Sequence, residues 1–333
     1  MVRDINRIIA NIETVIIGKT EEIKLILAAL LVGGHVLLED VPGTGKTVLA
    51  KALAKSFDCA FSRVQFTPDL LPSELTGINF YNLKDGAFTF RKGSLFANIV
   101  LGDEINRATP RTQSGLLESM EERQITVDGT TYPLPAPYFV IATQNPIETQ
   151  GTFPLPEAQL DRFLLQLKLG YPTSEESTDI LKRFIAADGA SGNPLDTLRA
   201  VCSAGDLLDM QAAVKRVFVH EVIFKYIVDL AEATRNHELV SMGISTRGIL
   251  ALAKTAQAWC AVNGGDFVTP QDVLDLMPYV FGHRLILKGG MNRRGGGSPQ
   301  TQTVLEGVRA SVTARSKFGK RAGKTRCLSL PWA

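Results

Sequence analysis

The run HVLLEDVPGTGKTVLAKAL constrains the fold of this chain more than any other part of its sequence. An apolar strand, His35–Leu38, leads into a loop with two glycines, and a helix over Val48–Phe57 follows. The main-chain N–H groups of such a loop and of the first helical turn point at one place and form an anion site. Gly43 and Gly45 let the backbone wrap a phosphate without a clash from a Cβ atom.

The residues after these glycines carry the chemistry of a nucleoside triphosphate site. The Lys46 ammonium group would reach the β- and γ-phosphates, and the Thr47 hydroxyl would ligate Mg²⁺. The generic pattern G-x-x-x-x-G-K-[ST] has a glycine where this chain has Asp40. The strand before the loop, the helix after it and the inner glycine still favour a phosphate loop over a plain strand–turn–helix connection. ATP is expected to bind through Val41, Pro42, Gly43, Thr44, Gly45, Lys46, Thr47 and Val48.

A second apolar strand ends in two carboxylates. The segment NIVLGDEIN predicts a strand over Ile99–Leu101, followed by Asp103 and Glu104. Ligands of parallel α/β sheets bind beyond the carboxyl ends of the strands, where this pair and Lys46 would meet. Asp103 is expected to hold the Mg²⁺ ion with its water shell, and Glu104 to orient the attacking water. An acidic strand end that faces solvent is the alternative for the pair taken alone.

Three more polar residues are candidates for contacts with the nucleotide. A strand in YFVIATQNP would end with the Asn145 amide near the γ-phosphate. Arg162, in PEAQLDRFL, is a candidate arginine finger that stabilises the charge of the transition state. A structural pair with Asp161 is the alternative for that residue. Arg247 stands in the first turn of a predicted helix, where it either contacts a nucleotide or stays on the surface.

Alternating helical and strand-like segments in the first half predict an α/β fold, a P-loop NTPase with a parallel sheet sandwiched by helices. Two Asp-Gly pairs, Asp85-Gly86 and Asp128-Gly129, predict β-hairpins inserted over Phe80–Arg91 and Gln124–Pro133. Further helices or strands are expected at Glu21–Leu31, Arg63–Phe66, Tyr138–Ala142 and Leu164–Leu169.

Helix signals dominate after Tyr171-Pro172. Thr173 and Glu176 form a capping box, a long helix should cover about His220–Arg235, and Thr269 should begin another. We therefore divide the chain into a nucleotide-binding core at 1–170, an all-helical lid subdomain at 171–288, and a last part at 289–333 with a Gly-rich linker, a helix near Thr303–Val312 and a basic tail.

Composition and charge exclude several other classes of protein. Apolar residues make up 45% of the 333 residues and charged residues 21%, as in folded globular proteins. The longest apolar stretch, Leu25–Val32, is much shorter than the roughly 20 residues of a membrane span. The first residues, MVRDINRII, do not resemble a secretory signal. The four cysteines are scattered, without the spacing of a disulfide framework or a metal site. We expect a cytoplasmic protein.

The charge distribution also argues against a nucleic-acid partner. The net charge is +2, yet six basic residues of the tail account for more than that, so the rest of the chain is mildly acidic. A nucleic-acid-binding protein would need a basic face on the folded body. A GTPase is disfavoured because the chain has no guanine-reading N-K-x-D motif.

Five segments in order, GGHVLLEDVPGTGKT, TPDLLPSELTG, ANIVLGDEINRATPRTQSGLLESMEERQITVDG, ATQNPIETQGTFPLPEAQLDRF and STRGILALAKTAQAW, resemble the MoxR family of AAA+ ATPases. The resemblance covers about residues 12–287. It implies Walker A roles for Lys46 and Thr47, Walker B roles for Asp103 and Glu104, sensor 1 for Asn145, the arginine finger for Arg162, sensor 2 for Arg247, and adenine contacts for Ile17 and Gly18.

The same resemblance implies a homo-oligomeric ring, a hexamer, in which Arg162 of one subunit completes the ATP site of the next. Whether Arg247 serves its own site or a neighbour's is left open, and Arg107 and Arg111 could share the interface. Both hairpins would face the ring centre. The implied role is chaperone-like remodelling of partners, such as von Willebrand A domain proteins or metalloenzymes. A metal (magnesium) chelatase subunit and a nucleotide-gated scaffold with little turnover are the alternatives.

Overall fold

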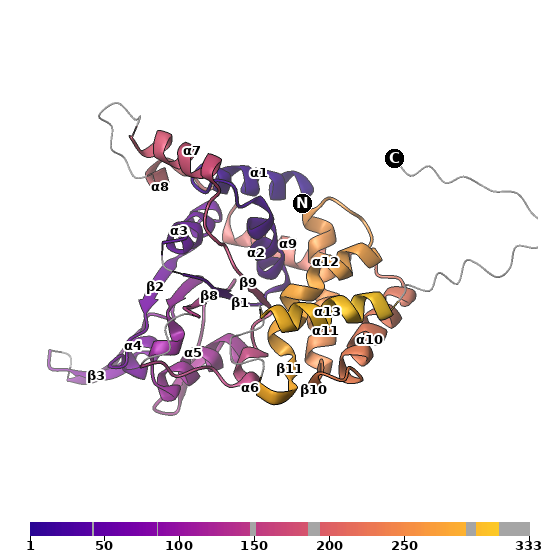
Figure 1. Cartoon of the computed structure of the whole chain (residues 1–333). Coiled ribbons are helices and arrows are strands. Elements are labelled where there is room, and N and C mark those ends of the chain that lie inside the picture. Colours follow the sequence, from indigo (N-terminus) through magenta and orange to yellow (C-terminus); the bar gives the residue numbers. More distant parts are fainter. Residues whose placement is uncertain (42, 85, 147–150, 186–193, 291–297, 313–333) are drawn as a thin grey trace, which may run out of the picture.

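The computed structural model describes residues 1–41, 43–84, 86–146, 151–185, 194–290 and 298–312. It has an α/β core and a helical C-terminal half beside it (Figure 1). Several predictions fall outside the described residues, namely those on Pro42, Asp85, the middle of the Gly-rich linker, Cys327 and the basic tail.

The core contains a parallel sheet of five strands in the order β2-β5-β8-β1-β9. Each strand lies where the sequence predicts one, within a few residues. Their bounds are Val36–Glu39 for β1, Phe61–Gln65 for β2, Ile99–Asp103 for β5, Phe139–Gln144 for β8 and Leu165–Leu167 for β9. All carboxyl ends meet at one edge, with β8 between the strands that carry the phosphate loop and the acidic pair.

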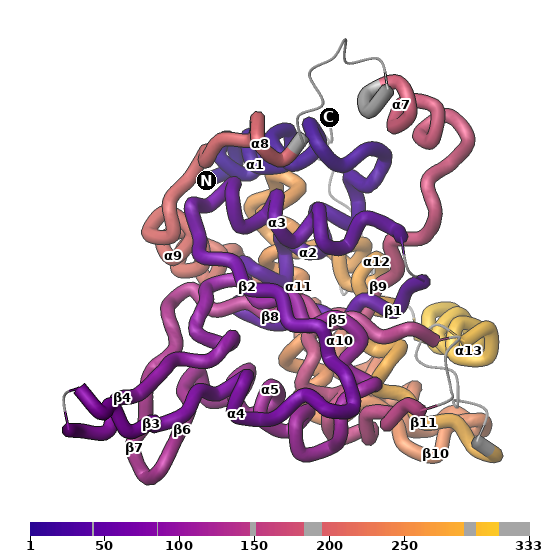
Figure 2. Tube along the Cα trace, turned by 90° about the vertical axis from the view of Figure 1, so that its left-hand side faces the viewer, coloured from indigo at the N-terminus to yellow at the C-terminus, as the bar shows by residue number. Residues whose placement is uncertain are grey.

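Helices bury both faces of this sheet, which explains why the strands are almost continuously apolar. Leu37 of β1 packs on one face, while its neighbours Val36 and Leu38 pack on the other. One face is covered by α1 (Val2–Glu13), α2 (Thr20–Val32) and α3 (Lys46–Ser56), and the other by α4 (Pro72–Thr76) and α5 (Pro110–Glu122), as Figures 1 and 2 show.

The two predicted β-hairpins are present and touch each other. One joins β3 (Ile78–Asn82) to β4 (Ala87–Arg91), and the other joins β6 (Gln124–Val127) to β7 (Thr130–Pro133). They project from the same side of the core (Figure 2). Between them, the rings of Phe90 and Tyr132 stack with centroids 3.9 Å apart, and Asn79 Nδ2 donates to Asp128 Oδ2 at 2.9 Å.

The second half is helical, with the predicted caps. Thr173 and Glu176 exchange the two hydrogen bonds of a capping box, and Thr269 does the same with Asp272. The helices of this half are α7 (Ser174–Ile185), α8 (Pro194–Thr197), α9 (Ala204–Val214), α10 (Glu221–Arg235), α11 (Thr246–Val262), α12 (Pro270–Phe281) and α13 (Pro299–Ser311), with 3-10 turns at Gly282–Arg284 and Lys288–Gly290. The core also contains a 3-10 turn at Ile105–Arg107 and the short helix α6 (Glu157–Leu160).

Three details differ from the predictions. The second half is not entirely helical, because β10 (Val240–Met242) pairs with β11 (Ile286–Leu287) across segments far apart in sequence. The last helix starts at Pro299, earlier than expected, because the Ser298 hydroxyl caps it. Helices α1, α4, α5, α8 and α9 were not predicted, although the buried isoleucines of α1 recur at helical spacing.

The core and the helical half share one hydrophobic core, in which α2 packs against α11. The three-part division of the chain stays a prediction. No described helix combines the length and the apolar character that crossing a membrane requires.

Candidate active site

The loop before α3 has the shape of a phosphate cradle. Gly43 and Gly45 adopt φ angles of +86° and +85°, which residues other than glycine rarely adopt. Apart from each glycine and its two chain neighbours, no described residue has a heavy atom within 4 Å of the place where a Cβ would stand. The Lys46 ammonium group donates to the carbonyl oxygens of Val41, at 2.8 Å, and Asp40, at 3.2 Å. The loop therefore curls around this cation and leaves open space above its glycines.

Asp40, the residue that departs from the generic motif, joins the loop to the last strand of the sheet. Its buried carboxylate accepts the N–H of Val41 through Oδ1 at 2.9 Å. Its Oδ2 accepts the N–H groups of Leu169 and Gly170, both at 3.0 Å, just beyond β9. A glycine at this position would leave these N–H donors without their acceptors, so Asp40 has a structural role.

The acidic pair and the phosphate loop line one cavity of about 370 Å³, although β8 separates their strands. Residues from three strands and from α3 contribute to its wall, among them Lys46, Thr47, Asp103, Glu104, Thr143 and Asn145. Side chains alternate along β8, so the residue between Thr143 and Asn145, Gln144, points instead to Glu39.

Thr143 holds the acidic pair in place. Its hydroxyl donates to Asp103 Oδ1 at 3.2 Å and accepts the main-chain N–H of Glu104 at 2.9 Å. Glu104 has a left-handed backbone, with φ at +57°, which is unusual for a residue with a side chain. Such conformations concentrate at functional sites, where neighbouring contacts hold them.

The sequence analysis missed two residues of this cavity, Arg63 and Gln65. Arg63 Nε donates to Asp103 Oδ2 at 2.7 Å, and Gln65 Nε2 donates to Glu104 Oε2 at 2.8 Å. Arg107, whose place at a subunit interface stays a prediction, pairs with Glu104 Oε2 of its own chain at 3.1 Å. The signal available for Arg63 and Gln65 was their alternation near the carboxyl end of a predicted strand, next to the strand with the acidic pair.

The donors in this cavity suit a magnesium ion that arrives with a nucleotide. Mg²⁺ prefers oxygen ligands and is usually held by one or two carboxylates together with phosphates of the substrate. The Thr47 hydroxyl and the Asp103 carboxylate supply such oxygens, and Arg63 already places a cation on Asp103. Within the described ranges, no group of three or more His, Cys, Asp and Glu side chains could hold a metal by itself.

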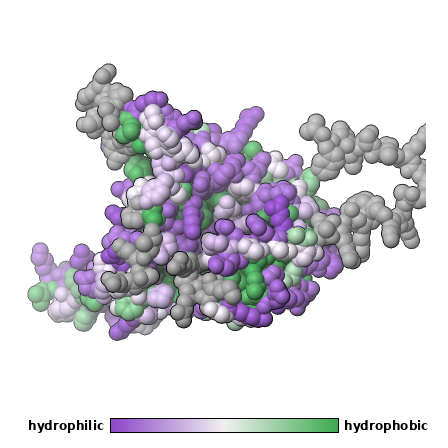
Figure 3. Space-filling model, viewed as in Figure 1, coloured by the Kyte–Doolittle hydropathy of each residue, from purple (hydrophilic) through white to green (hydrophobic). Residues whose placement is uncertain are grey.

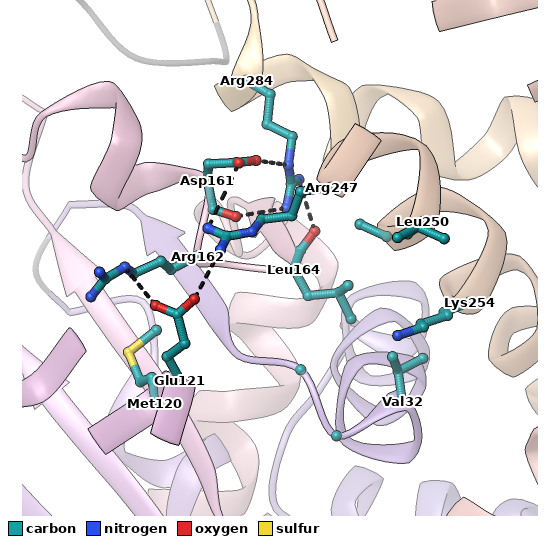
Figure 4. A pocket seen from close by; sticks show the side chains of 13 residues that line it. Val32, Met120, Glu121, Asp161, Arg162, Leu164, Arg247, Leu250, Lys254 and Arg284 are labelled. Carbon is teal, nitrogen blue, oxygen red and sulfur yellow. Dashed lines mark hydrogen bonds and ion pairs between the residues drawn. The ribbon is translucent and has the colours of Figure 1, made fainter. Parts of the chain in front are cut away.

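The two candidate arginines lie together at a second cavity of about 460 Å³, between the core and the helical half (Figure 4). The Glu121 carboxylate stands between them. Its Oε2 is 3.3 Å from Arg162 Nε, and its Oε1 accepts from Arg247 Nη2 at 2.9 Å. The cavity lining also includes Lys254, Arg284 and Asp161 but no residue of the phosphate loop or the acidic pair.

This second cavity is at the opposite edge of the sheet from the first. Gly33 and Gly34, in its wall, immediately precede β1, and Arg162 precedes β9, which pairs in parallel with β1. The phosphate loop follows the other end of β1, whose four residues span about 13 Å. Arg162 and Arg247 are therefore remote from the Lys46 of their own chain.

Arg284 joins the helical side of this cavity to the core. Its side chain is buried, and it donates to Asp161 Oδ1 at 2.7 Å and to the carbonyl oxygens of Phe163 and Leu164 at 2.6 and 3.2 Å. Burial lowers the pKa of Arg284, and Asp161 opposes that shift. Asp161 thus has Arg284 as its close partner rather than its sequence neighbour Arg162.

The proposed adenine contacts, Ile17 and Gly18, lie in the turn between α1 and α2. Gly18 has a φ of +72°, and the Glu176 side chain packs where a Cβ would stand. Neither residue lines the cavity of the phosphate loop.

The β3–β4 hairpin has an apolar surface, seen as green among purple at the lower left of Figure 3. Leu83 and Phe88 are 88% and 74% exposed, and Ile78 and Tyr81 are about half exposed. Clusters of exposed apolar side chains mark surfaces that meet another molecule.

Comparisons with known proteins agree with this architecture. Residues 35–165 match the family model for the "ATPase family associated with various cellular activities (AAA)", and residues 232–306 match an AAA lid domain. The chain is 48% identical over 311 residues to YeaC of Bacillus subtilis, with 93% of this chain and 92% of that protein covered. It is 40% identical over 295 residues to Chaperone MoxR1 of Mycobacterium tuberculosis, with coverages of 86% and 76%.

A crystal structure of a presumed ATPase from Cytophaga hutchinsonii superposes with a TM-score of 0.84 at 36% identity. The match covers 93% of this chain and 94% of that one. The lid match extends past residue 287, into α13.

Proposed function

Because this chain belongs to the MoxR family of AAA ATPases, we propose that it binds Mg·ATP at the loop before Lys46 and hydrolyses it with Asp103 and Glu104. Lys46 leaves the loop carbonyls to bind the β- and γ-phosphates. Thr47 and Asp103 hold Mg²⁺, which supplies positive charge at the phosphates undergoing transfer. Glu104, oriented by Gln65 and Arg107, accepts the hydrogen bond of the attacking water.

The main observation in support of this proposal is that the proposed site residues lie at two opposite edges of the sheet. Lys46, Thr47, Asp103 and Glu104 line the cavity at the carboxyl edge, while Arg162 and Arg247 line the one at the amino edge. An arginine finger at the amino edge can serve only the nucleotide of another subunit. We propose that both arginines act on the neighbouring subunit in a homo-oligomeric ring, a hexamer.

The relatives and the hairpins support a proposal for the role of the ring. We propose chaperone-like remodelling of partner proteins, including von Willebrand A domain proteins or metalloenzymes, since a relative is named Chaperone MoxR1. The exposed side chains of the β3–β4 hairpin would contact the client, and nucleotide state would move the hairpins through the core. The free thiols of Cys59, Cys202 and Cys260 support a cytoplasmic setting.

The nucleotide site is tested by Lys46→Ala. This variant is expected to fold like the wild type, because the ammonium group only contacts its own loop, yet to lose ATP binding. Isothermal titration calorimetry measures the affinity, and circular dichroism checks the fold. Wild-type ATP affinity in the variant would refute the proposed site.

Hydrolysis is tested with Glu104→Gln, which keeps the shape of the side chain but removes its charge. Single-turnover hydrolysis should slow by at least about a hundredfold while ATP still binds, since the residue positions water rather than phosphate. Equal single-turnover rates in the variant and the wild type would support a nucleotide-gated scaffold instead.

The shared site is tested by mixing inactive variants. Arg162→Ala and Glu104→Gln proteins should each lack turnover when alone. Mixed rings place an intact Glu104 beside an intact Arg162 at some interfaces, so activity should return. Failure of the mixture, with mixed assembly verified by native mass spectrometry, would count against the trans arrangement.

A further inference from the structure

Glu121, at the C-terminal end of α5, contacts both candidate arginines with separate oxygens. Arg162 is held through Nε at 3.3 Å, so its two terminal amino groups stay directed away from Glu121 (Figure 4). Arg247 is held through Nη2 at 2.9 Å. This carboxylate orients one side of each guanidinium group and leaves other N–H donors for a phosphate.

The charge balance of the cavity gives Glu121 a second effect. Four cationic side chains line this cavity, together with two carboxylates. Asp161 is held closely by the buried Arg284 and is 3.9 Å from Arg247. Glu121 is the carboxylate in this lining that joins Arg162 to Arg247, two cations which would otherwise repel each other at close range.

A stabilising role alone explains this arrangement poorly. The side chains of Glu121, Arg162 and Arg247 are 39%, 32% and 50% exposed. Ion pairs with such exposure contribute little to folding, because water and salt screen them. The backbone around Glu121 has a separate anchor, in which His35 Nε2 bonds to the carbonyl of Met120 at 3.0 Å.

We propose that Glu121 is a positioning residue that aligns Arg162 and Arg247 as a pair for the triphosphate of the neighbouring subunit. This inference rests on the proposed trans arrangement. Glu121 does not touch the nucleotide. It holds one arginine from the core and one from the lid at a common spacing, so both reach the neighbour's γ-phosphate together.

The test uses Glu121→Gln in the full chain, with Glu122→Gln as the matched control. Glu122 is exposed on the same helix and does not line the cavity. Glu121→Gln should lower kcat at least about tenfold, with ATP affinity and melting temperature close to the wild type. The control should stay within about twofold of wild-type turnover. Wild-type or faster turnover of Glu121→Gln would overturn the inference.

Mixing experiments separate a positioning role from a general defect. Glu121→Gln has an intact site of its own, so mixing it with Glu104→Gln, which carries intact arginines, should restore activity. Mixing it with Arg162→Ala should not restore activity, because both variants lack a working arginine pair to offer the neighbouring ATP site.

The outcome also distinguishes this inference from the proposed function. If Arg162→Ala complements Glu104→Gln but Glu121→Gln does not, the role of Glu121 is wrong and the shared site stands. If neither pair complements, the shared site itself is wrong, and the inference falls with it.

Discussion

At the scale of single residues, His35 shows how burial selects a protonation state. Val140 N–H donates to its Nδ1 at 3.0 Å, so the ring proton lies on Nε2 and is donated to the Met120 carbonyl. Burial lowers the pKa of His35 from 6.5 to about 3, and the charge of Arg123 adds to this shift. The folded protein therefore keeps this ring neutral where the unfolded chain protonates it.

The resulting pH dependence has a definite sign. Above about pH 6.5 the ring is neutral in both states, and stability is fully present. As the pH falls from 6.5 toward 3, only the unfolded chain takes up the proton, so the free energy of unfolding decreases by about 1.4 kcal/mol per pH unit. Urea unfolding at pH 7 and pH 5 should give a loss about 2 kcal/mol smaller for His35→Gln than for the wild type.

A loss of stability between the two pH values that is the same for His35→Gln and the wild type would contradict the assignment of a neutral, buried His35.

Asp40 allows a second prediction at this scale. Asp40→Gly restores the generic motif, but it removes the acceptors of Val41, Leu169 and Gly170. The free energy of unfolding should fall by about 2 kcal/mol or more, because buried donors lose their partners. Chemical denaturation measures this loss, and a variant as stable as the wild type would show that these bonds contribute nothing.

At the scale of elements, the two hairpins behave as one unit. Two contacts join the β3–β4 hairpin to the β6–β7 hairpin, the stacking of Phe90 on Tyr132 and the hydrogen bond from Asn79 to Asp128. The β3–β4 hairpin has the surface that would contact clients, and the β6–β7 hairpin directly follows α5. Because Glu121 lies in the last turn of α5, a shift of the arginine cavity and a shift of the hairpins would involve the same helix. In the proposed ring, this connection would link the subunit interface to the client.

A double-mutant cycle measures this coupling. Phe90→Ala, Tyr132→Ala and the double variant should give an interaction energy of about 1 kcal/mol in unfolding experiments, as for other aromatic pairs. Ile78→Ala combined with Phe88→Ala serves as the control, since the alternation of side chains along the two strands places Ile78 and Phe88 on opposite faces of the hairpin. Additive effects of Phe90→Ala and Tyr132→Ala would mean that the hairpins move independently.

At the scale of the whole molecule, Arg284 links the helical half to the segment that carries Arg162, the candidate arginine finger. It binds Asp161 and Phe163, the residues on either side of Arg162. In the proposed ring, a change in lid position would therefore be transmitted to Arg162, and nucleotide state in one subunit would reach the next through this contact.

Removing Arg284 should weaken the whole fold. Arg284→Met leaves Asp161 without its close partner and several carbonyl groups without donors, which should cost about 3 kcal/mol or more. Differential scanning calorimetry should show a lower melting temperature. Arg235→Met, a helix-end arginine that binds a single carbonyl, is the comparison and should cost less. Equal losses of stability in the two variants would contradict a special stabilising role of Arg284.

The local sequence predicted most of the elements and half of the site. Strand, glycine loop and helix around Lys46 follow one another along the chain, so short-range patterns suffice to predict them. The strand that ends in Asp103 and Glu104 was equally clear. Helices α1, α4, α5, α8 and α9 were missed, and the start of α13 was placed too late, although Ser298 and Pro299 form a typical helix start.

By itself, the sequence determined a P-loop core with a lid, since these elements depend on residues adjacent in the chain. Only the tertiary structure decided that β8 lies between β1 and β5, that Arg63 and Gln65 hold the acidic pair, and that Arg162 and Arg247 meet at Glu121 on the opposite sheet edge. These relations depend on strand order and on side chains far apart in sequence, which no local pattern encodes.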